Sequence, residues 1–267
     1  DYAEPDYLAT VADFPTDLPN DNNFSDKQWG LENTGQIIGG QTGMIDADID
    51  TADAWKKTTG NGVIVAVLDT GIDASHPELS GKVVLQKDFA GTGTVDDMNG
   101  HGTHVSGIIA ANTNNSIGVA SVCPGCKLLN GKVLDNTGSG SYSAIASGVT
   151  WAADNGAKVI NLSLGGSYSS TTLQNAINYA WNKGVVIVAA AGNNGNQTKF
   201  YPAAYPNVVS VASTNNQDKK SFFSTYGSWV MVSAPGEDIY STLPTHSFYL
   251  NTQYGDSFNY DYLSGTS

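Results

Sequence analysis

Three side chains that are far apart in the sequence could together perform nucleophilic chemistry. Asp69 ends the apolar run VIVAVLD, His101 lies in the glycine-rich segment NGHGTHVSG, and Ser267 closes the segment LSGTS. A serine hydroxyl becomes a nucleophile when a histidine accepts its proton and a carboxylate orients that histidine. The chain order acid, histidine, serine is one of the convergent arrangements of this triad. The three residues therefore predict acyl transfer to a serine.

Each of these residues also has a plainer interpretation. Asp69 precedes a Thr-Gly pair and could be an ordinary turn residue. His101 and His104 are three residues apart, so they share one helical face and could bind a metal ion. Zinc peptidase signatures, however, place two histidines four residues apart with a glutamate between them. We therefore predict that His101 is a base and that His104 packs in the core, whereas His76 and His246 are structural or exposed.

The composition limits the class of protein. Of the 267 residues, 40% are hydrophobic, which is enough for a folded core. The net charge of −13 argues against nucleic acid or an anionic membrane surface as a partner, because both require basic patches. No apolar run reaches the roughly 18 residues of a membrane span. These features suit a soluble, secreted protein whose leader has been removed.

Short valine-rich runs alternate with helical segments from residue 61 onward. Parallel strands buried on both faces have continuous apolar sequences, and their alternation with helices is typical of α/β proteins. We predict a mostly parallel sheet with helices on both faces. The strands are expected at 63–69, 82–89, 127–134, 158–164, 185–191 and 208–214, and the helices at 101–112, 143–156 and 171–184.

Such a sheet would bring distant residues to one edge. Ligands of parallel sheets bind beyond the carboxyl ends of the strands. Asp69 directly follows the strand expected at 63–69, and Asn193 follows the one expected at 185–191. Both side chains are therefore expected at this edge, although Asn193 could also be a simple turn residue in the segment GNNG.

Cys123 and Cys126, in the segment CPGC, are the two cysteines of the chain. A dithiol redox motif of this spacing usually opens a helix, but this one leads into a strand-like run. A zinc site would need further ligands, and no histidine lies close in the sequence. We favour a small structural disulfide that forms in an oxidising compartment.

Five segments together resemble the signatures of one enzyme family. LDTGID (68–73), NGHGTHVSG (99–107) and LSGTS (263–267) are similar to the catalytic segments of the subtilisin-like serine proteases, the subtilases. SLGG (163–166) and AAAGNNG (189–195) resemble the substrate-binding strand and the oxyanion segment of that family. Each segment is weakly specific by itself, but all five occur in the family's order.

The resemblance covers about residues 19–267, and it is strongest with thermitase-like members in KVLDNTGSG, YAWNKGVVIVAAAGN and FSTYGSWV. It implies a three-layer, doubly wound α/β fold around a mostly parallel, seven-stranded sheet. It also implies a secreted serine endopeptidase that hydrolyses peptide bonds through an acyl-enzyme. Ser267 would be the nucleophile, His101 the general base and Asp69 the residue that orients it, while the Asn193 amide and the Ser267 backbone N–H would hold the oxyanion.

The resemblance further implies how a peptide would bind. An extended peptide would pair with two segments of the enzyme as an additional strand, and glycines would allow the close approach. Small residues around the first specificity pocket imply broad specificity with a preference for large apolar residues before the cut. Loop geometry alone would also explain the glycines. The matching residues are Gly138, Ser139, Gly140, Ser163, Leu164 and Gly165 for the strands, Ala190, Ala191 and Gly192 for the first pocket, and Tyr142 for a pocket further upstream.

A structural calcium ion is a further implication of the resemblance. Carboxylate and carbonyl oxygens suit Ca²⁺, although an Asn-rich surface loop would be a plainer interpretation of the same residues. The expected ligands are Asp21, Glu78 (usually aspartate in the family), Asn115 and the backbone carbonyls of Asn112, Ile117 and Val119. Weaker candidates are a second site with Asp88, Asp96 and Asp97 and a third near Ala203, Tyr205 and Val208.

The chain departs from the family pattern at both ends and in one insertion. Residues 1–18 resemble the end of the family's inhibitory propeptide, and they are either a propeptide tail or a plain extension of the peptidase domain at 19–267. We interpret the C-terminal part of that domain as missing after Ser267: either it forms a second chain after nicking, or Ser267 is chemically modified. The protein is otherwise expected to be a monomer. The tail 241–262 is expected to be irregular, with aromatic residues of 246–262 packing over the leaving-group side of the cleft or among themselves.

Two other functions remain as alternatives to a protease that acts on polypeptides. A catalytically silent, subtilase-like binding module usually lacks catalytic residues, whereas all four are present here. An esterase with the same triad would leave the peptide-pairing segments unused. We therefore predict a secreted, calcium-stabilised serine endopeptidase.

Overall fold

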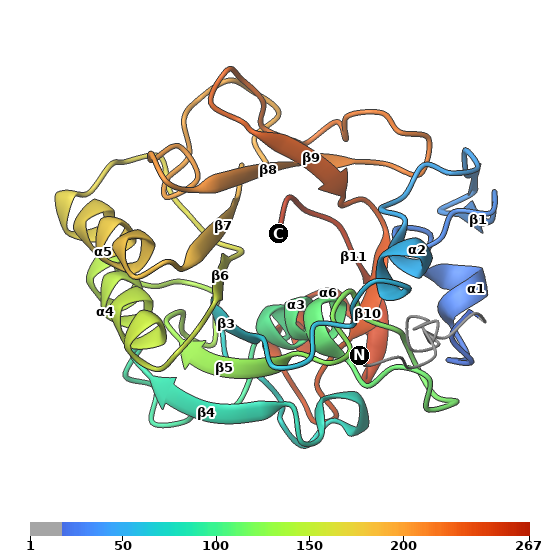
Figure 1. Cartoon of the computed structure of the whole chain (residues 1–267), viewed down its shortest axis with the longest axis horizontal. Coiled ribbons are helices and arrows are strands. Elements are labelled where there is room, and N and C mark those ends of the chain that lie inside the picture. The colour runs from blue at the N-terminus through green and yellow to red at the C-terminus, as the bar shows by residue number, and fades with distance from the viewer. Residues whose placement is uncertain (1–17) are drawn as a thin grey trace, which may run out of the picture.

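A parallel sheet of seven strands forms the centre of the computed structural model, which describes residues 18–267 (Figure 1). The strand order is β4-β5-β3-β6-β7-β8-β9, and all neighbouring strands are parallel. This sheet confirms the predicted α/β fold. The strands are β3 (Ile64–Asp69), β4 (Val83–Asp88), β5 (Lys127–Lys132), β6 (Val159–Leu162), β7 (Val186–Ala190), β8 (Val209–Thr214) and β9 (Val232–Pro235).

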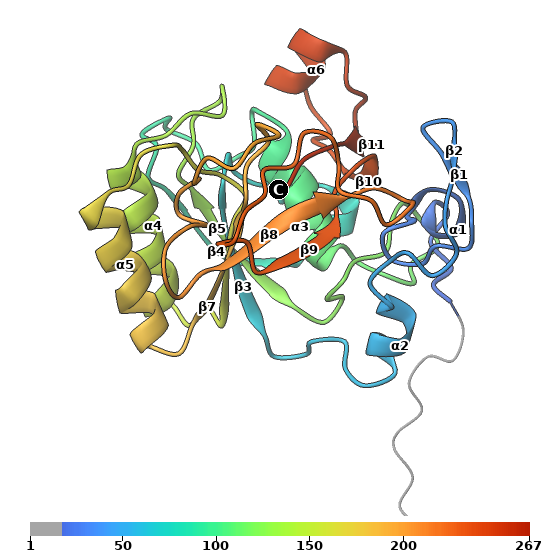
Figure 2. The ribbon, with the colours of Figure 1, turned by 90° about the horizontal axis from the view of Figure 1, so that it is seen from above.

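Helices cover both faces of the sheet. α4 (Tyr142–Asp154) and α5 (Thr171–Asn182) lie side by side along one face, and α3 (His101–Ala110) lies on the other (Figures 1 and 2). The side chains of Ser141 and Ser170 cap the N-termini of α4 and α5 by accepting hydrogen bonds from backbone N–H groups. The shorter helices are α1 (Phe24–Lys27), α2 (Thr51–Trp55), the 3₁₀ turn Pro77–Leu79 and α6 (Tyr249–Tyr254).

Alternating residues of β3 divide the core into two layers. Ala66 and Leu68 pack with residues of α4 and α5, whereas Val65 and Val67 pack with residues of α3. Successive side chains of a strand point to opposite faces, so a strand that is buried on both sides must be apolar throughout. The carboxyl end of β3 is thus fixed from both faces, and Asp69 is the residue at that end. Among residues 18–267, no helix has the length and apolar character needed to cross a membrane.

The tail 241–262 is more regular than predicted, so that expectation is wrong. β10 (Ile239–Thr242) and β11 (Tyr260–Leu263) form an antiparallel pair, and α6 lies between them in the sequence. Two small sheets thus flank the large one, because β1 (Ile37–Ile38) and β2 (Gln41–Thr42) also pair. Aromatic packing orders the tail: the Phe248 side chain is buried and meets Phe258 edge to face.

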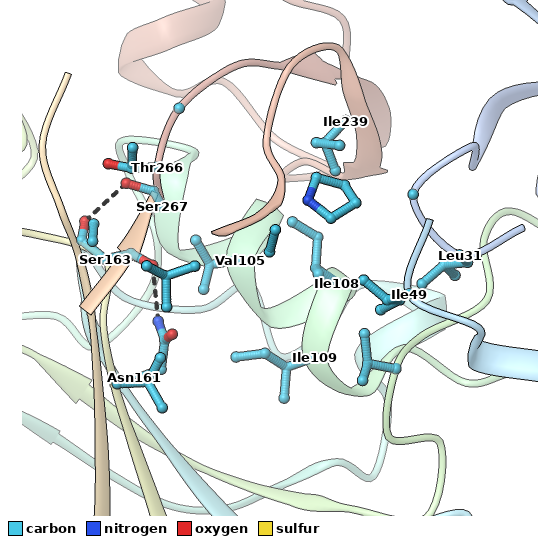
Figure 3. A pocket seen from close by; sticks show the side chains of 18 of the residues that line it. Leu31, Ile49, Val105, Ile108, Ile109, Asn161, Ser163, Ile239, Thr266 and Ser267 are labelled. Carbon is cyan, nitrogen blue, oxygen red and sulfur yellow. Dashed lines mark hydrogen bonds between the residues drawn. The ribbon is translucent and has the colours of Figure 1, made fainter. Parts of the chain in front are cut away.

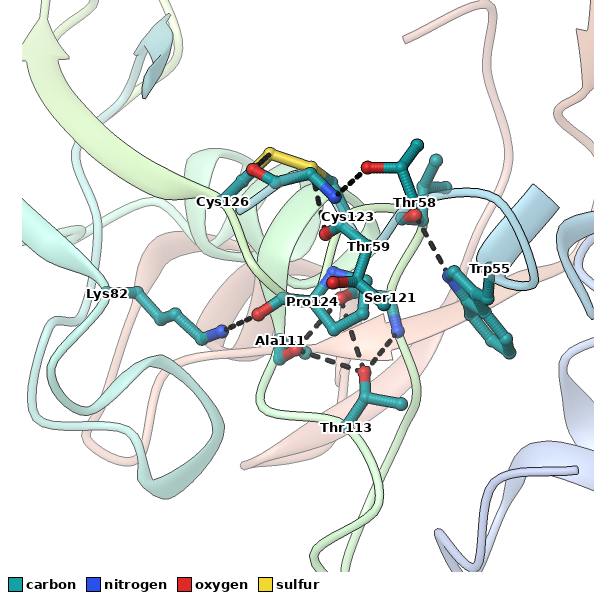
Figure 4. The surroundings of a disulfide bond; sticks show 12 residues. Trp55, Thr58, Thr59, Lys82, Ala111, Thr113, Ser121, Cys123, Pro124 and Cys126 are labelled. Carbon is teal, nitrogen blue, oxygen red and sulfur yellow. Dashed lines mark hydrogen bonds between the residues drawn. A yellow bond between two sulfur atoms is a disulfide. The ribbon is translucent and has the colours of Figure 1, made fainter. Parts of the chain in front are cut away.

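The two cysteines form a disulfide, Cys123–Cys126, in the turn that precedes β5 (Figure 4). The Gly125 N–H donates to the Thr59 carbonyl at 2.8 Å, and the Lys82 ammonium donates to the Pro124 carbonyl. These contacts join the turn to the segment before β3 and to the end of the loop before β4. The disulfide closes a small loop, so its effect is to fix this turn locally.

His104 is buried on α3 and links that helix to the antiparallel pair. Its Nε2 atom lies 3.0 Å from the Ile239 carbonyl oxygen and 3.2 Å from that of Asp261, so this nitrogen carries the proton and donates. Burial is the main cause that lowers the pKa of His104 to about 4. A neutral, packed His104 agrees with the predicted core role.

The free energy of unfolding is expected to fall as the pH decreases from about 6.5 to about 4. In this range the unfolded chain binds a proton on residue 104 that the folded chain does not bind, and the loss approaches about 3 kcal/mol. His76, whose pKa burial also lowers, acts in the same direction. Urea unfolding at several pH values should show a smaller pH dependence for His104→Gln than for the unchanged protein, and equal slopes would contradict this account.

Candidate active site

Asp69 and His101 meet where β3 ends and α3 begins. The Asp69 carboxylate is buried, and its Oδ1 atom lies 2.7 Å from Nδ1 of His101. The same oxygen accepts a hydrogen bond of 2.7 Å from the Thr70 backbone N–H. Gly102 makes this approach possible, because a Cβ atom there would lie 2.1 Å from the Gly71 carbonyl oxygen. Two segments separated in the sequence thus form the acid–base half of the predicted triad.

The charge of Asp69 controls the protonation of His101. Burial disfavours the imidazolium, but the Asp69 charge and its hydrogen bond together outweigh burial and raise the pKa of His101. Because Nδ1–H donates to the carboxylate, Nε2 is left as the acceptor in the neutral ring. The arrangement therefore prepares His101 to take a proton and stabilises the cation that results.

Ser267 and Asn193 line one pocket together with His101 and Gly265. The Ser267 hydroxyl donates to the Ser163 carbonyl at 3.3 Å in this structure, rather than to His101. The structure thus brings all four predicted catalytic residues to one place, with the serine turned toward the segment after β6.

The Asn193 amide is oriented by Thr266, a residue that sequence reasoning missed. Asn193 Oδ1 accepts hydrogen bonds of 2.9 Å from both the backbone N–H and the hydroxyl of Thr266. The Thr266 hydroxyl oxygen in turn accepts from the Gly192 N–H at 3.0 Å. Since the amide oxygen is used, the NH₂ group remains as the donor, and a Cβ atom on Gly265 would lie only 3.3 Å from it.

The predicted substrate strands line a groove that starts at His101. Gly138 to Gly140, Ser163 to Gly165 and Tyr142 all line this groove. The remaining predicted substrate residues lie elsewhere: Ala190 and Ala191 are buried, and Gly192 faces the Phe200 ring. The groove is therefore lined by backbone-rich segments, as strand addition by a peptide requires.

The profile of the Subtilase family matches residues 60–267. This chain belongs to the subtilase family. Thermitase of Thermoactinomyces vulgaris is 50% identical over 231 residues, which cover 86% of this chain and 77% of thermitase. A thermophilic serine proteinase of Bacillus sp. (strain AK1) is 45% identical over 269 residues, which cover all of this chain but 59% of that protein. The chain is accordingly a hydrolase of the serine protease type.

Solved structures agree with this assignment. A protease of Pseudoalteromonas arctica PAMC 21717 superposes with a TM-score of 0.78 at 33% identity, over 93% of this chain and 82% of that one. A cold-adapted subtilisin-like serine proteinase gives a TM-score of 0.69 at 34% identity, over 91% of this chain and 80% of that one. The predicted family and fold are both confirmed.

The aromatic insertion of this subtilase, residues 246–262, contributes to the lining of the groove. Tyr249, Leu250 and Tyr254 of α6 line it, and Leu250 also lines the pocket that contains Ser267. Backbone hydrogen bonds from the Tyr249 and Leu250 N–H groups to the Met98 and Asn99 carbonyls, at 2.9 and 3.0 Å, hold the start of α6 beside His101. Figure 2 shows α6 standing out beyond the end of the large sheet. The insertion thus lines the groove, and its place on the leaving-group side stays a prediction.

Most of the expected calcium ligands lie together. The Glu78 carboxylate is buried and accepts from the Asn115 side chain at 2.8 Å and from the Val119 N–H at 3.1 Å. Asp21 accepts from the Asn115 N–H at 3.2 Å. Burial, and to a smaller degree the Asp21 charge, raise the pKa of Glu78. Asn112 and Ile117 are the two remaining expected ligands. The Asn112 side chain donates to the Pro77 and Ser80 carbonyls, and the Ile117 side chain is exposed.

The three aspartates considered for a second ion do not converge. Asp97 accepts from the Asn99, Gly100 and Thr103 N–H groups and thereby caps α3. Asp88 accepts from N–H groups of its own loop. Asp96 instead lies 3.1 Å from His246 Nε2 and forms a group with that residue and Asp73. The carboxylates of Asp88 and Asp97 thus accept hydrogen bonds from nearby backbone N–H groups. The three aspartates do not form the second ion site considered from the sequence.

An apolar cavity of about 230 Å³ adjoins Ser267 and separates it from α3 (Figure 3). Val105, Ile108 and Ile109 of α3 line one side, and Ile239 lines another. Ser163 and Asn161, which hydrogen-bond each other at 2.9 Å, lie at its rim near Ser267. Our expectation of further chain after Ser267 stays a prediction.

Thr266→Val should lower kcat about tenfold with little change in KM. The substitution keeps the shape but removes the hydroxyl that holds the Asn193 amide, so the transition state loses about 1.4 kcal/mol of stabilisation. Thr266→Ser retains the hydroxyl and should restore kcat. Steady-state kinetics on a peptide substrate would measure both variants. An equal loss in the two, following their thermal stability, would instead indicate a purely structural role.

Proposed function

We propose that this subtilase is a secreted endopeptidase of broad specificity, in which Ser267, His101, Asp69 and Asn193 carry the reaction. The observation that carries the proposal is the 2.7 Å contact between buried Asp69 and His101, in a pocket that Ser267 and Asn193 also line. A structural role for the same residues would not require a histidine oriented by a buried carboxylate to share one pocket with a hydroxyl and a side-chain amide.

The reaction proceeds in two halves. His101 Nε2 takes the proton of the Ser267 hydroxyl while Oγ attacks the substrate carbonyl carbon, and the carbonyl oxygen becomes an oxyanion. The Asn193 NH₂ group and the Ser267 N–H donate to this oxygen, and they do so most strongly when its charge develops. The intermediate collapses as His101 gives its proton to the leaving amine. Water then repeats the sequence and releases the acyl group.

The groove supports a polypeptide as the substrate. Its sides offer backbone groups from 138–140 and 163–165, which bind an extended chain regardless of its side chains, and this supports broad specificity. A small ester would leave these backbone groups unused. A silent binding module is less well supported, because it would have no need of a raised His101 pKa next to a buried carboxylate.

Calcium is the ion that the chain's own residues would hold beside α3. Two carboxylates, Asp21 and Glu78, lie in one partly buried site in which the Asp21 charge contributes to the raised pKa of Glu78, and Asn115 and Val119 complete its border. Oxygen donors of this kind fit Ca²⁺, which would neutralise the two charges and join the N-terminal arm to the loop after α3. The ion has a structural role and takes no part in the reaction.

Several finer expectations belong to the same proposal. The disulfide is consistent with an oxidising, extracellular compartment. The propeptide interpretation of residues 1–18 concerns residues that, except for Leu18, lie outside the described part of the chain. We keep the expectations that the propeptide inhibits the enzyme, that residues 19–267 belong to the peptidase domain and that the enzyme is a monomer.

A serine-directed sulfonyl fluoride tests the proposed function. The protein, expressed from its complete reading frame, should gain the mass of one adduct and lose its activity on casein. Ser267→Ala should prevent the adduct and lower kcat by more than about 10³-fold, as the loss of a triad member does in general. The matched control Ser147→Ala changes an exposed serine on α4 and should behave like the unchanged protein. Adduct formation on Ser267→Ala would refute the assignment.

Removal of calcium should lower the melting temperature of this subtilase by about 5–10 °C, because a saturating ligand of the folded state adds a few kcal/mol. Glu78→Gln should abolish this dependence. In the presence of a chelator the variant should melt close to the unchanged protein, since the amide is not repelled by Asp21 but offers one acceptor oxygen fewer to Asn115 and Val119. Glu237→Gln is the control of equal charge. Calorimetry with calcium and with chelator distinguishes these outcomes, and a full calcium effect in Glu78→Gln would contradict the site.

A further inference from the structure

The ring of Phe200 lies between two glycines that the sequence assigned to substrate binding. A Cβ atom added to Gly165 would lie 2.5 Å from Cε1 of Phe200, and one added to Gly192 would lie 3.0 Å from its Cγ. Contacts as short as 2.5 Å do not occur between real side chains, so the ring rests directly on the backbone of Gly165. Gly192, on the segment after β7, touches the other part of the ring.

The backbone around Phe200 fixes the ring in this place. Tyr201 and Gly166 exchange two hydrogen bonds of 2.8 Å, one from each N–H to the other's carbonyl. The Phe200 carbonyl accepts a third, also of 2.8 Å, from the Ala204 N–H. The segment that carries Phe200 is therefore paired with the same strand that supplies Ser163 to Gly165 to the groove. The ring itself is half-buried, so its remaining edge is open to solvent or to a substrate.

We propose that Phe200 fills most of the first specificity pocket, so that this subtilase prefers a small residue, alanine or serine, immediately before the cut bond. The inference rests on the proposed function, because it concerns the same groove. The sequence predicted 190–192 as a wall of that pocket, and the ring contacts both Gly192 in this wall and Gly165 in the peptide-pairing segment. A large substrate side chain needs the volume that the ring occupies, whereas a methyl group does not.

This geometry revises the preference expected from the sequence. Small residues at 190–192 predicted a roomy pocket, but the Phe200 ring packs where Gly192 lacks a side chain. At Gly165 a side chain would also meet the Tyr201 carbonyl oxygen at 2.5 Å. The Phe200 ring thus occupies the space that side chains at Gly165 and Gly192 would otherwise fill. Position 200 therefore determines the specificity of this site.

Peptide p-nitroanilides that differ only in the residue before the cut test the proposal. With the protein expressed from its complete reading frame, we expect kcat/KM to be at least about tenfold higher for alanine than for phenylalanine, since steric rejection of even small groups changes rates about 10–200-fold. Phe200→Gly should open the pocket and reverse the order, mainly by raising kcat/KM for phenylalanine. Phe200→Leu, which leaves a smaller side chain, should give an intermediate ratio.

Phe222→Gly serves as the matched control, because Phe222 is highly exposed and contacts neither wall. It should keep the ratio of the unchanged protein. If Phe200→Gly does not fold, the alanine-to-phenylalanine ratio of kcat/KM can still be compared between the unchanged protein and Phe200→Leu, and this comparison tests the proposal. A preference for phenylalanine in the unchanged protein, or an unaltered ratio in folded Phe200 variants, would overturn the pocket assignment alone. Absence of hydrolysis of every peptide, with no sulfonyl adduct on Ser267, would instead overturn the proposed function.

Discussion

The contact between Asp69 and His101 depends on how closely α3 can begin against the end of β3. That approach is a steric matter, since Gly102 lies where any side chain would collide with the Gly71 carbonyl. Apolar packing on both faces of β3 holds the carboxylate in position, and its burial makes the interaction with the imidazole strong. The protonation of His101 thus follows from the packing of a strand and a helix rather than from a local sequence feature.

Asp97 also stabilises the contact between the end of β3 and the start of α3. Its two carboxylate oxygens accept from the Asn99, Gly100 and Thr103 N–H groups, which are donors that the start of α3 would otherwise leave unsatisfied. The Thr70 hydroxyl donates to Asp97 and accepts from Gly102, so that one chain of hydrogen bonds runs from the end of β3 to the start of α3. A residue that was considered as a metal ligand therefore positions His101.

The sequence alone predicted those features that are determined by the residues of one short, continuous segment. Runs rich in apolar residues identified six strands, because strands that pack on both faces of a sheet are mostly apolar. β9 was missed because VSAP is short, and β10, α6 and β11 were missed because aromatic packing, which has no period, orders them. Thr266 and Phe200 act only through partners that are distant in the sequence, Asn193 in one case and Gly165 in the other. Their roles could be found only from the three-dimensional contacts.

The features that distinguish this subtilase lie in the segments that border the common catalytic edge. Phe200 packs against Gly165, which lines the groove, and residues of α6 line the groove as well. These segments are not independent of the catalytic residues, because Phe248, which anchors α6, packs where Gly100 lacks a side chain. Gly100 has a φ of 114°, which other residues rarely adopt, and it directly precedes His101. Gly100 therefore both begins α3 and leaves room for the Phe248 ring of the insertion. A change in the packing of α6 would for this reason also change the position of His101.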